Sequence, residues 1–269
     1  MIKMLDVSAG YNNEVIIKNI QVAFEAGTLT SIIGKNGCGK TTLLKTAANI
    51  LRPYNGQVII DKSGNWINVH DLKSKEVATK ISYMPQHKEI PNISVLGLVM
   101  HGRFPYLNFS RILKKKDHEI VEKALEITGT IDLRHKNLQE LSGGQRQKVY
   151  LAMVLAQDTE ILFLDEPTTY LDIDHQFEIL NLIEILKKMG KTIVMVIHDI
   201  NNALKYSDKV CLMDKGEIIL CDTPKEIIES KHIDRIFNIC CEEIWVDSTK
   251  ANQYIISYKE KKFKSQNAI

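Results

Sequence analysis

Short apolar runs separated by turn residues dominate the beginning of the chain. Four of them, each bounded by polar or glycine positions, are typical of strands: 2–7, 14–18, 20–24 and 29–33. The sequence Glu25-Ala26-Gly27-Thr28 favours a hairpin turn between the last two runs. We therefore expect an antiparallel β-subdomain at the N-terminus.

Later runs are apolar throughout rather than alternating. Residues 161–164 and 192–197 contain no charged position, which is typical of parallel strands buried on both faces. Helical spacing fits residues 174–189 between them, and 209–213 with 217–221 fit a hairpin. This order of strand, helix and strand predicts an α/β fold with a parallel sheet.

A segment of helical periodicity interrupts the α/β pattern. The alternation fades after residue 86, and apolar residues such as Val95, Leu98 and Val99 then fall on one helix face. We interpret about 87–155 as an all-helical subdomain inserted into a single domain of residues 1–240. Residues 241–269 are expected to form a C-terminal tail extension.

Composition narrows the class of protein. The 269 residues carry a net charge of +2, which gives no sign of the basic surface that nucleic acids need, so we expect no nucleic-acid partner. Five cysteines without metal-ligand spacing fit a reducing compartment. No apolar run approaches the roughly 20 residues that span a bilayer, and Asp6 comes too early for a signal peptide. We expect a cytosolic protein that reaches a membrane only through a partner.

The clearest chemical motif lies between the apolar run 29–33 and a helical stretch. It matches the phosphate-binding pattern G-x-x-x-x-G-K-[ST] at every fixed position. Glycines let backbone N–H groups approach phosphate oxygens, and the helix N-terminus adds partial positive charge. Lys40 is expected to reach the β- and γ-phosphates of ATP, and the Thr41 hydroxyl to ligate Mg²⁺. The expected nucleotide-binding residues are Gly34, Lys35, Asn36, Gly37, Cys38, Gly39, Lys40, Thr41 and Thr42.

Two carboxylates end the apolar run 161–164. We expect Asp165 to hold Mg²⁺ directly or through water, and Glu166 to act as general base on the attacking water. A strand capped by solvated acids is the alternative, and the upstream P-loop makes it the weaker hypothesis. His198 follows the run 192–197 at the carboxyl edge, where α/β sheets bind ligands, so we interpret it as a γ-phosphate contact.

Two further residues have plain structural alternatives. Gln86 opens the helical segment, so its amide can contact Mg²⁺ or the attacking water from a subdomain junction. An ordinary exposed glutamine is the alternative. Tyr11 precedes the P-loop in the early β region, where its ring can stack on adenine. A half-buried tyrosine at a strand end is the alternative.

Residues 141–145, Leu-Ser-Gly-Gly-Gln, form a second candidate anion site at the start of a helix. Ser142 suits the N-cap position, and Gly143 and Gly144 leave backbone N–H groups bare. One nucleotide does not need two such sites on one chain. The economical explanation is a head-to-tail dimer, in which this loop closes over the ATP of the second copy.

Together these motifs resemble those of the ATP-binding subunit of an ABC transporter. In the family's order they are Tyr11, 34–42, Gln86, 141–145, 161–166, the segment Tyr170-Leu171-Asp172 and His198. The resemblance implies a P-loop NTPase fold that hydrolyses ATP with Mg²⁺ and holds two nucleotides between two copies. It also implies that Gln86 and the helical subdomain dock onto a membrane permease. The residues it adds to the nucleotide site are Ser142, Gly143, Gly144, Gln145 and Asp172.

A narrower resemblance concerns the cargo. The segments 101–106, His-Gly-Arg-Phe-Pro-Tyr, and 168–176 resemble importers of iron–siderophore, haem and cobalamin. The resemblance implies a subunit at the cytoplasmic face of the cell membrane that drives uptake of an iron chelate through a permease, with a substrate-binding protein as indirect partner. Iron–siderophore is the first candidate, and haem or cobalamin the alternative. The rivals are a soluble ABC protein acting on nucleic acid or ribosomes, a module that does not hydrolyse ATP, and an exporter subunit.

Overall fold

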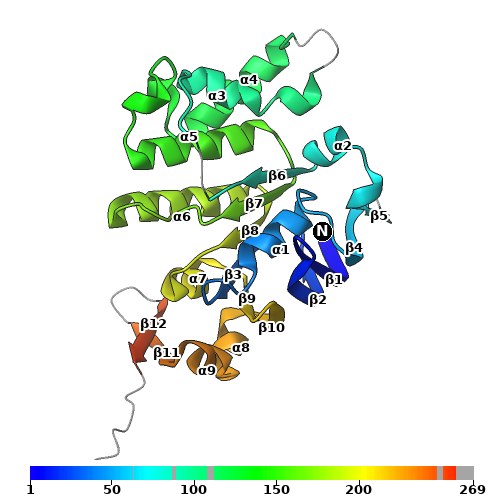
Figure 1. The fold of residues 1–269 in the computed structure, drawn as a ribbon. Coiled ribbons are helices and arrows are strands. Elements are labelled where there is room, and N and C mark those ends of the chain that lie inside the picture. The colour runs from blue at the N-terminus through cyan, green and yellow to red at the C-terminus, as the bar shows by residue number, and fades with distance from the viewer. Residues whose placement is uncertain (63, 87–88, 108–111, 247–250, 259–269) are drawn as a thin grey trace, which may run out of the picture.

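A computed structural model of the chain describes residues 1–62, 64–86, 89–107, 112–246 and 251–258. Its centre is a six-stranded sheet with the strand order β10-β9-β3-β8-β7-β6 (Figure 1). The strands are β3 (Leu29–Gly34), β6 (Ile81–Met84), β7 (Ile161–Asp165), β8 (Thr192–Val196), β9 (Lys209–Asp214) and β10 (Glu217–Asp222). All neighbours are parallel except the hairpin β9–β10, so the predicted α/β fold and this hairpin are confirmed.

The strand order decides where the chemical motifs meet. β3 lies beside β8, β8 beside β7, and β7 beside β6, all in parallel register. Because these strands point the same way, their carboxyl ends form one edge of the sheet. The P-loop follows β3 there, and the acids and the expected His198 and Gln86 follow the other three strands.

A second, antiparallel sheet has the order β2-β1-β4-β5. Its strands are β1 (Ile2–Tyr11), β2 (Glu14–Phe24), β4 (Asn55–Lys62) and β5 (Asn65–Asn68). The runs 14–18 and 20–24 are therefore one strand. The hairpin turn expected at residues 25–28 is wrong, because β2 and β3 belong to different sheets and these residues cross between them.

The helix α1 (Lys40–Ala47) is buried between the two sheets. Its Leu43 and Leu44 are fully buried in a cluster that also contains residues of β1, β2, β7 and β8. Phe24 of β2 meets Phe163 of β7 edge to face, with ring centroids 6.3 Å apart. Burial of this helix on both sides holds the P-loop at its N-terminus in place.

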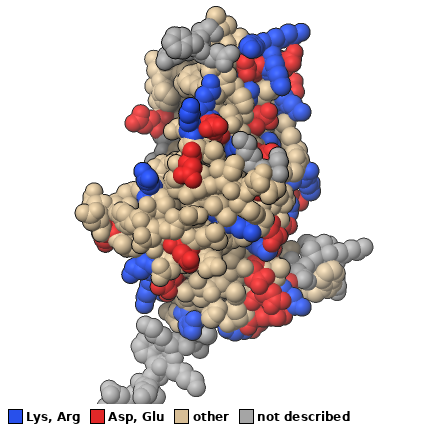
Figure 2. Space-filling model, turned by 90° about the vertical axis from the view of Figure 1, so that its right-hand side faces the viewer, with Lys and Arg blue, Asp and Glu red and all other residues tan. Residues whose placement is uncertain are grey.

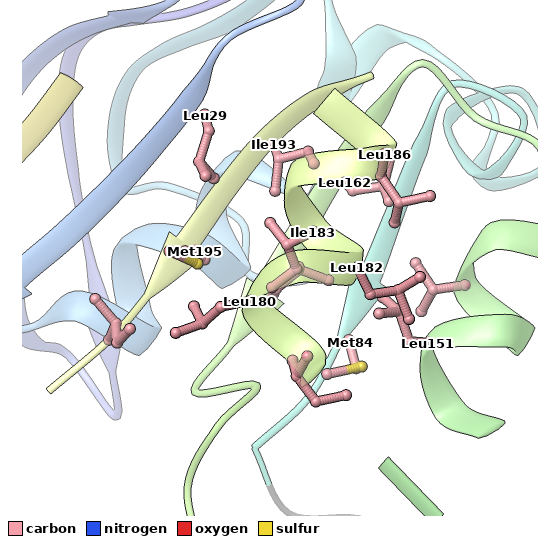
Figure 3. Close-up of a cluster of buried hydrophobic side chains, with 14 of the residues drawn as sticks. Leu29, Met84, Leu151, Leu162, Leu180, Leu182, Ile183, Leu186, Ile193 and Met195 are labelled. Carbon is pink, nitrogen blue, oxygen red and sulfur yellow. The ribbon is translucent and has the colours of Figure 1, made fainter. Parts of the chain in front are cut away.

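Between β6 and β7, the described residues form three α-helices and short 3₁₀ turns. The helices are α3 (Val95–His101), α4 (Lys115–Ile127) and α5 (Gly143–Ala156), which lie together at the top of Figure 1. The helix α6 (Ile173–Lys188) lies between them and the sheet. Figure 3 shows Leu182 and Ile183 of α6 within the apolar cluster that joins Leu162 of β7 to Leu151 of α5.

The remaining elements were not all expected. The helix α2 (Ser74–Ala78) follows β5, α7 (Ile200–Tyr206) follows β8, and α8 (Pro224–Glu229) and α9 (His232–Phe237) follow β10. The strands β11 (Ile239–Val246) and β12 (Ala251–Tyr258) then form an antiparallel hairpin. The expected domain boundary after residue 240 therefore falls inside β11. Cys241 of that strand is fully buried in the main apolar cluster.

The surface carries both signs of charge. Figure 2 shows Lys and Arg side chains interspersed with Asp and Glu over the face in view, in keeping with the net charge of +2. Among the residues that the structure describes, no helix combines the length and the apolar character needed to cross a bilayer.

Candidate nucleotide site

A cleft of about 590 Å³ opens at the carboxyl edge of the parallel sheet. It brings together residues from both sheets and from the start of the helical segment. The sequence predicted ten of its lining residues: Tyr11, Asn36, Gly37, Gly39, Lys40, Thr41, Thr42, Gln86, Glu166 and His198. Three others, Ile16, Thr169 and Tyr170, were not assigned to the site, although Tyr170 belongs to the segment 170–172 that the family resemblance names.

The P-loop has the backbone that its glycines permit. Gly37 and Gly39 have φ angles of 77° and 102°, in the left-handed region where other residues are strained. Gly39 is the N-cap of α1, so the first N–H groups of that helix have no intrahelical partner and point out of its N-terminus. This end of α1 is suited to bind an anion.

Lys40 places a buried positive charge in the P-loop. Its residue is only 6% exposed, and Nζ donates to the carbonyls of Gly34 at 2.8 Å and Lys35 at 3.0 Å. Within the described residues no carboxylate lies at ion-pair distance from this ammonium. A buried cation without a counter-charge is costly, so the loop fits an anionic group such as the phosphates of a nucleotide.

Asp165 lies at the end of β7, opposite the start of α1. The Thr41 hydroxyl donates to Oδ1 at 3.0 Å and the Tyr83 hydroxyl to Oδ2 at 3.0 Å. Burial raises the pKa of Asp165, and both hydrogen bonds oppose this rise. The pKa of Tyr83 is raised, first by burial and then by the charge of Asp165.

These oxygens fit part of a magnesium site. A carboxylate and a hydroxyl are hard ligands, and Mg²⁺ is bound in proteins by one or two carboxylates together with phosphates and water. No cluster of three or more His, Cys, Asp or Glu ligands occurs among the described residues. Thr41 and Asp165 would supply protein oxygens to Mg²⁺ bound with a nucleotide.

Glu166 lines the cleft. It is 8% exposed, and its φ of 52° places a non-glycine residue in the left-handed region. Its Oε1 is 2.6 Å from His198 Nε2, and its Oε2 accepts from Gln86 Nε2 at 2.6 Å and from Thr169 Oγ1 at 2.9 Å. The structure thus gathers the three expected catalytic side chains. Strained backbone of this kind persists where the surroundings enforce it, often at functional sites.

Not every P-loop residue turns its side chain into the cleft. Lys35 and Cys38 line a neighbouring cavity of about 560 Å³, together with Lys215 and Arg235. Cys38 is buried there, and burial raises the pKa of its thiol. Neither residue is among those that line the nucleotide cleft.

Residues 142–145 and Asp172 do not line the cleft. Ser142 is the N-cap of α5, as expected, because its Oγ accepts from the Gln145 N–H at 3.2 Å. The Gln145 side chain accepts from the Ser142 N–H at 3.2 Å, which completes a capping box. Asp172 is the N-cap of α6. The second candidate anion site therefore lies outside the nucleotide cleft of the same chain.

Tyr83 and Thr169 belong to the site through hydrogen bonds to the two acids, and the two residues differ in how visible these bonds are in the sequence. Tyr83 belongs to a run predicted only as a buried strand, yet its hydroxyl reaches an acid 82 positions later. Thr169 lies three residues after Glu166, a spacing that signals a local hydrogen bond to a carboxylate. The polar side chains near an expected catalytic acid were the signal that could have identified Thr169.

A glycine-rich loop between a parallel strand and a helix, with a buried lysine and acids on the adjacent strand ends, defines a P-loop nucleotide-binding protein. The family model described as ABC transporter matches residues 17–169. This chain belongs to the ABC transporter family, and its fold is that of the family's ATPase cassettes.

Curated relatives match most of the chain. The Iron(3+)-hydroxamate import ATP-binding protein FhuC of Bacillus subtilis is 40% identical over 235 residues, covering 87% of this chain and 86% of FhuC. The Ferric enterobactin transport ATP-binding protein FepC of Escherichia coli is 39% identical, covering 87% and 86%.

Solved structures share the fold. The inward-facing conformation of a putative metal-chelate type ABC transporter has a TM-score of 0.81, at 24% identity over 96% of this chain and 98% of the other. The dimeric structure of MJ0796, a bacterial ABC transporter cassette, has a TM-score of 0.72, at 28% identity over 83% and 99%.

Proposed function

We propose that this chain is the ATP-hydrolysing subunit of an importer that takes up an iron chelate, with iron–siderophore complexes as the cargo. The observation that carries the hydrolytic role is Glu166, a carboxylate at the end of β7 between His198 and Gln86 in the cleft of the P-loop. The cargo is supported by the names of the relatives, which transport iron hydroxamate and ferric enterobactin.

The chain's residues would divide the work on ATP as follows. Lys40 and the N-terminus of α1 bind the phosphates, and Thr41 and Asp165 hold Mg²⁺, which neutralises charge on the transferring phosphoryl group when bound. Glu166 takes a proton from the attacking water, and His198 holds the carboxylate through its Nε2, 2.6 Å away. Gln86 and Thr169 fix the other carboxylate oxygen.

The position of the second candidate anion site bears on the partners of this chain. The helix end at Ser142 lies outside the cleft of its own chain, so we infer that it closes over the ATP of a second copy in a head-to-tail dimer. The dimer would dock on membrane permease subunits through the helical subdomain at the cytoplasmic face of the cell membrane. A substrate-binding protein on the other side would deliver the cargo.

Uptake of a radiolabelled iron chelate by the native host tests this function. We expect a strain without this chain to lose uptake of one ferric siderophore, and the wild-type chain to restore it while Glu166→Gln does not. Co-purification of a multi-helix permease with the chain would agree. Normal siderophore uptake in the deletion strain, or recovery of ribosomes or DNA instead of a permease, would contradict the proposal.

Tyr11 gives a prediction on nucleotide selectivity. Its residue is 42% exposed at the end of β1 and lines the cleft, where its ring can stack on adenine. We expect Tyr11→Ala to weaken ATP binding about tenfold, in line with roughly 1–3 kcal/mol for a base stacked on an aromatic ring, and to reduce the preference for ATP over GTP. Fluorescence titration with both nucleotides measures this. Unchanged affinity would mean that Tyr11 has only a structural role. The control is Tyr54→Ala, because Tyr54 is also exposed but does not line the cleft.

Tyr83 gives a prediction on magnesium and pH. Tyr83→Phe removes a hydrogen bond that favours the ionised form of Asp165, so the already raised pKa of this acid rises further. The carboxylate is the form that holds the metal. We therefore expect about tenfold more Mg²⁺ for half-maximal ATPase activity, and an acid limb of the pH profile displaced to higher pH. Mg²⁺ titrations at pH 6 and pH 8 test both. A profile that stays in place would show that Tyr83 does not act through Asp165.

A further inference from the structure

His175, the third residue of α6, lies between two functional loops of one chain. Its backbone N–H donates to Asp172 Oδ1 at 3.1 Å, and its ring Nδ1 is hydrogen-bonded to the same carboxylate oxygen. The pKa of Asp172 is lowered, first by the hydrogen bond from the His175 side chain. Two bonds to one N-cap residue thus restrict the orientation of the imidazole.

The imidazole packs directly on the glycine of the second anion site. A Cβ built on Gly144 would lie 2.0 Å from His175 Cδ2 and 2.5 Å from Cγ, so no other residue fits there without displacing the ring. Gly144 is buried, although it lies in the first turn of α5. Part of the requirement for glycine at this position therefore comes from the chain's own histidine rather than from a ligand.

Two more contacts join α5 to the chain that follows β7: one reaches the loop before α6, and one reaches α6, which runs beside α5 (Figure 1). The Gln147 side-chain amide donates to the carbonyl of Pro167, the residue after Glu166. Lys148 pairs with Glu178 at 3.0 Å. The helix that carries Ser142 is thus joined to the loop after Glu166 through Gln147 and to α6 through Lys148. Of these contacts, the one with His175 lies nearest to Ser142 in α5, because it is made at Gly144.

We propose that His175 is a positioning residue, which holds residues 142–145 at a set place relative to Asp172 so that both reach the second copy together. The proposal rests on the head-to-tail dimer of the proposed function. In that dimer, the N–H groups at the start of α5 act on ATP held by the other copy. Displacement of a catalytic loop by about 1 Å can cost up to a hundredfold in rate.

Steady-state kinetics of His175→Ala test the proposal. We expect kcat to fall at least tenfold, while KM for ATP and the affinity of the single chain for ATP stay within twofold, because the P-loop is untouched. In the Glu166→Gln background, the protein concentration needed for half-maximal ATP-driven association should rise about tenfold. His118→Ala, an exposed histidine on α4, is the matched control and should change none of these values.

A second variant separates the packing of the ring on Gly144 from its hydrogen bond to Asp172. His175→Phe keeps a planar ring against Gly144 but loses the Asp172 bond, so kcat should fall by about threefold, less than for alanine. If the alanine variant does not fold, the phenylalanine variant carries the test. A kcat within twofold of wild type for both, or a loss matched by an equal rise in KM, would overturn the role of His175. If two copies of the Glu166→Gln protein do not associate in the presence of ATP, the shared site of the proposed function is rejected instead.

Discussion

Glu166→Gln lowers the steady-state ATPase rate of the purified protein by at least a hundredfold, and leaves ATP binding within about threefold of wild type. General base catalysis contributes about 10²–10⁴ in rate, and the amide cannot take a proton from water. The substitution preserves size, so His198, Gln86 and Thr169 keep a polar partner. Release of phosphate under saturating Mg²⁺–ATP measures the loss.

Glu160→Gln is the matched control for this prediction. Glu160 is exposed and directly precedes β7, at the end of the strand opposite to Glu166. The same chemical change there should leave the ATPase rate unaltered. A Glu166→Gln protein that turns over ATP at the wild-type rate would remove Glu166 from the reaction, and His198 would then be the residue to test as base.

Ser142→Arg abolishes hydrolysis while the single chain still binds ATP with wild-type affinity. The arginine side chain fills the helix end that we place over the second copy's ATP, and no residue of 142–145 lines the cleft of its own chain. Binding of ATP below the concentration at which copies associate should therefore be unchanged. Isothermal titration at low protein concentration, alongside ATPase assays at high concentration, separates the two properties.

Loss of the N-cap complicates that variant, because replacing a capping serine costs about 1 kcal/mol of stability. Ser142→Asp resolves this. Aspartate keeps an acceptor for the Gln145 N–H, which now bonds to Ser142 Oγ at 3.2 Å, but places negative charge where we expect a phosphate. We expect the same loss of hydrolysis with an unchanged melting temperature. Ser74→Arg on α2, also exposed, should affect neither property. Weakened ATP binding by the isolated Ser142→Arg chain would contradict a site supplied to the other copy.

Local patterns predicted the parts of the fold in which neighbours in sequence decide the structure. The apolar run of β3, the glycines of the P-loop and the helical stretch of α1 were each predicted, because the residue types within each segment favour the structure that it adopts. The uncharged runs of β7 and β8 are buried strands for the same reason. The hairpin predicted at residues 25–28 was wrong because the same turn residues can precede a strand that pairs with the previous one or a strand of another sheet.

The sequence likewise predicted some residues of the site and not others. Spacing located Lys40, Asp165 and Glu166, since each follows a strand whose carboxyl end lies at one edge of the sheet. It did not reveal Tyr83, whose partner is set by the pairing of β6 with β7. Nor did the spacing show that Lys35 and Cys38 line the neighbouring cavity instead of the cleft, because the P-loop pattern leaves the residue types at these two positions open.

Sedimentation equilibrium of the Glu166→Gln protein tests the shared nucleotide site most directly. We expect the 30.6 kDa mass of one copy without nucleotide and twice that mass with saturating Mg²⁺–ATP. Adding Ser142→Arg to the same protein should return it to the single mass at every ATP concentration. A protein that stays at one copy with ATP, or a double variant that still associates, would contradict the head-to-tail arrangement of the two sites.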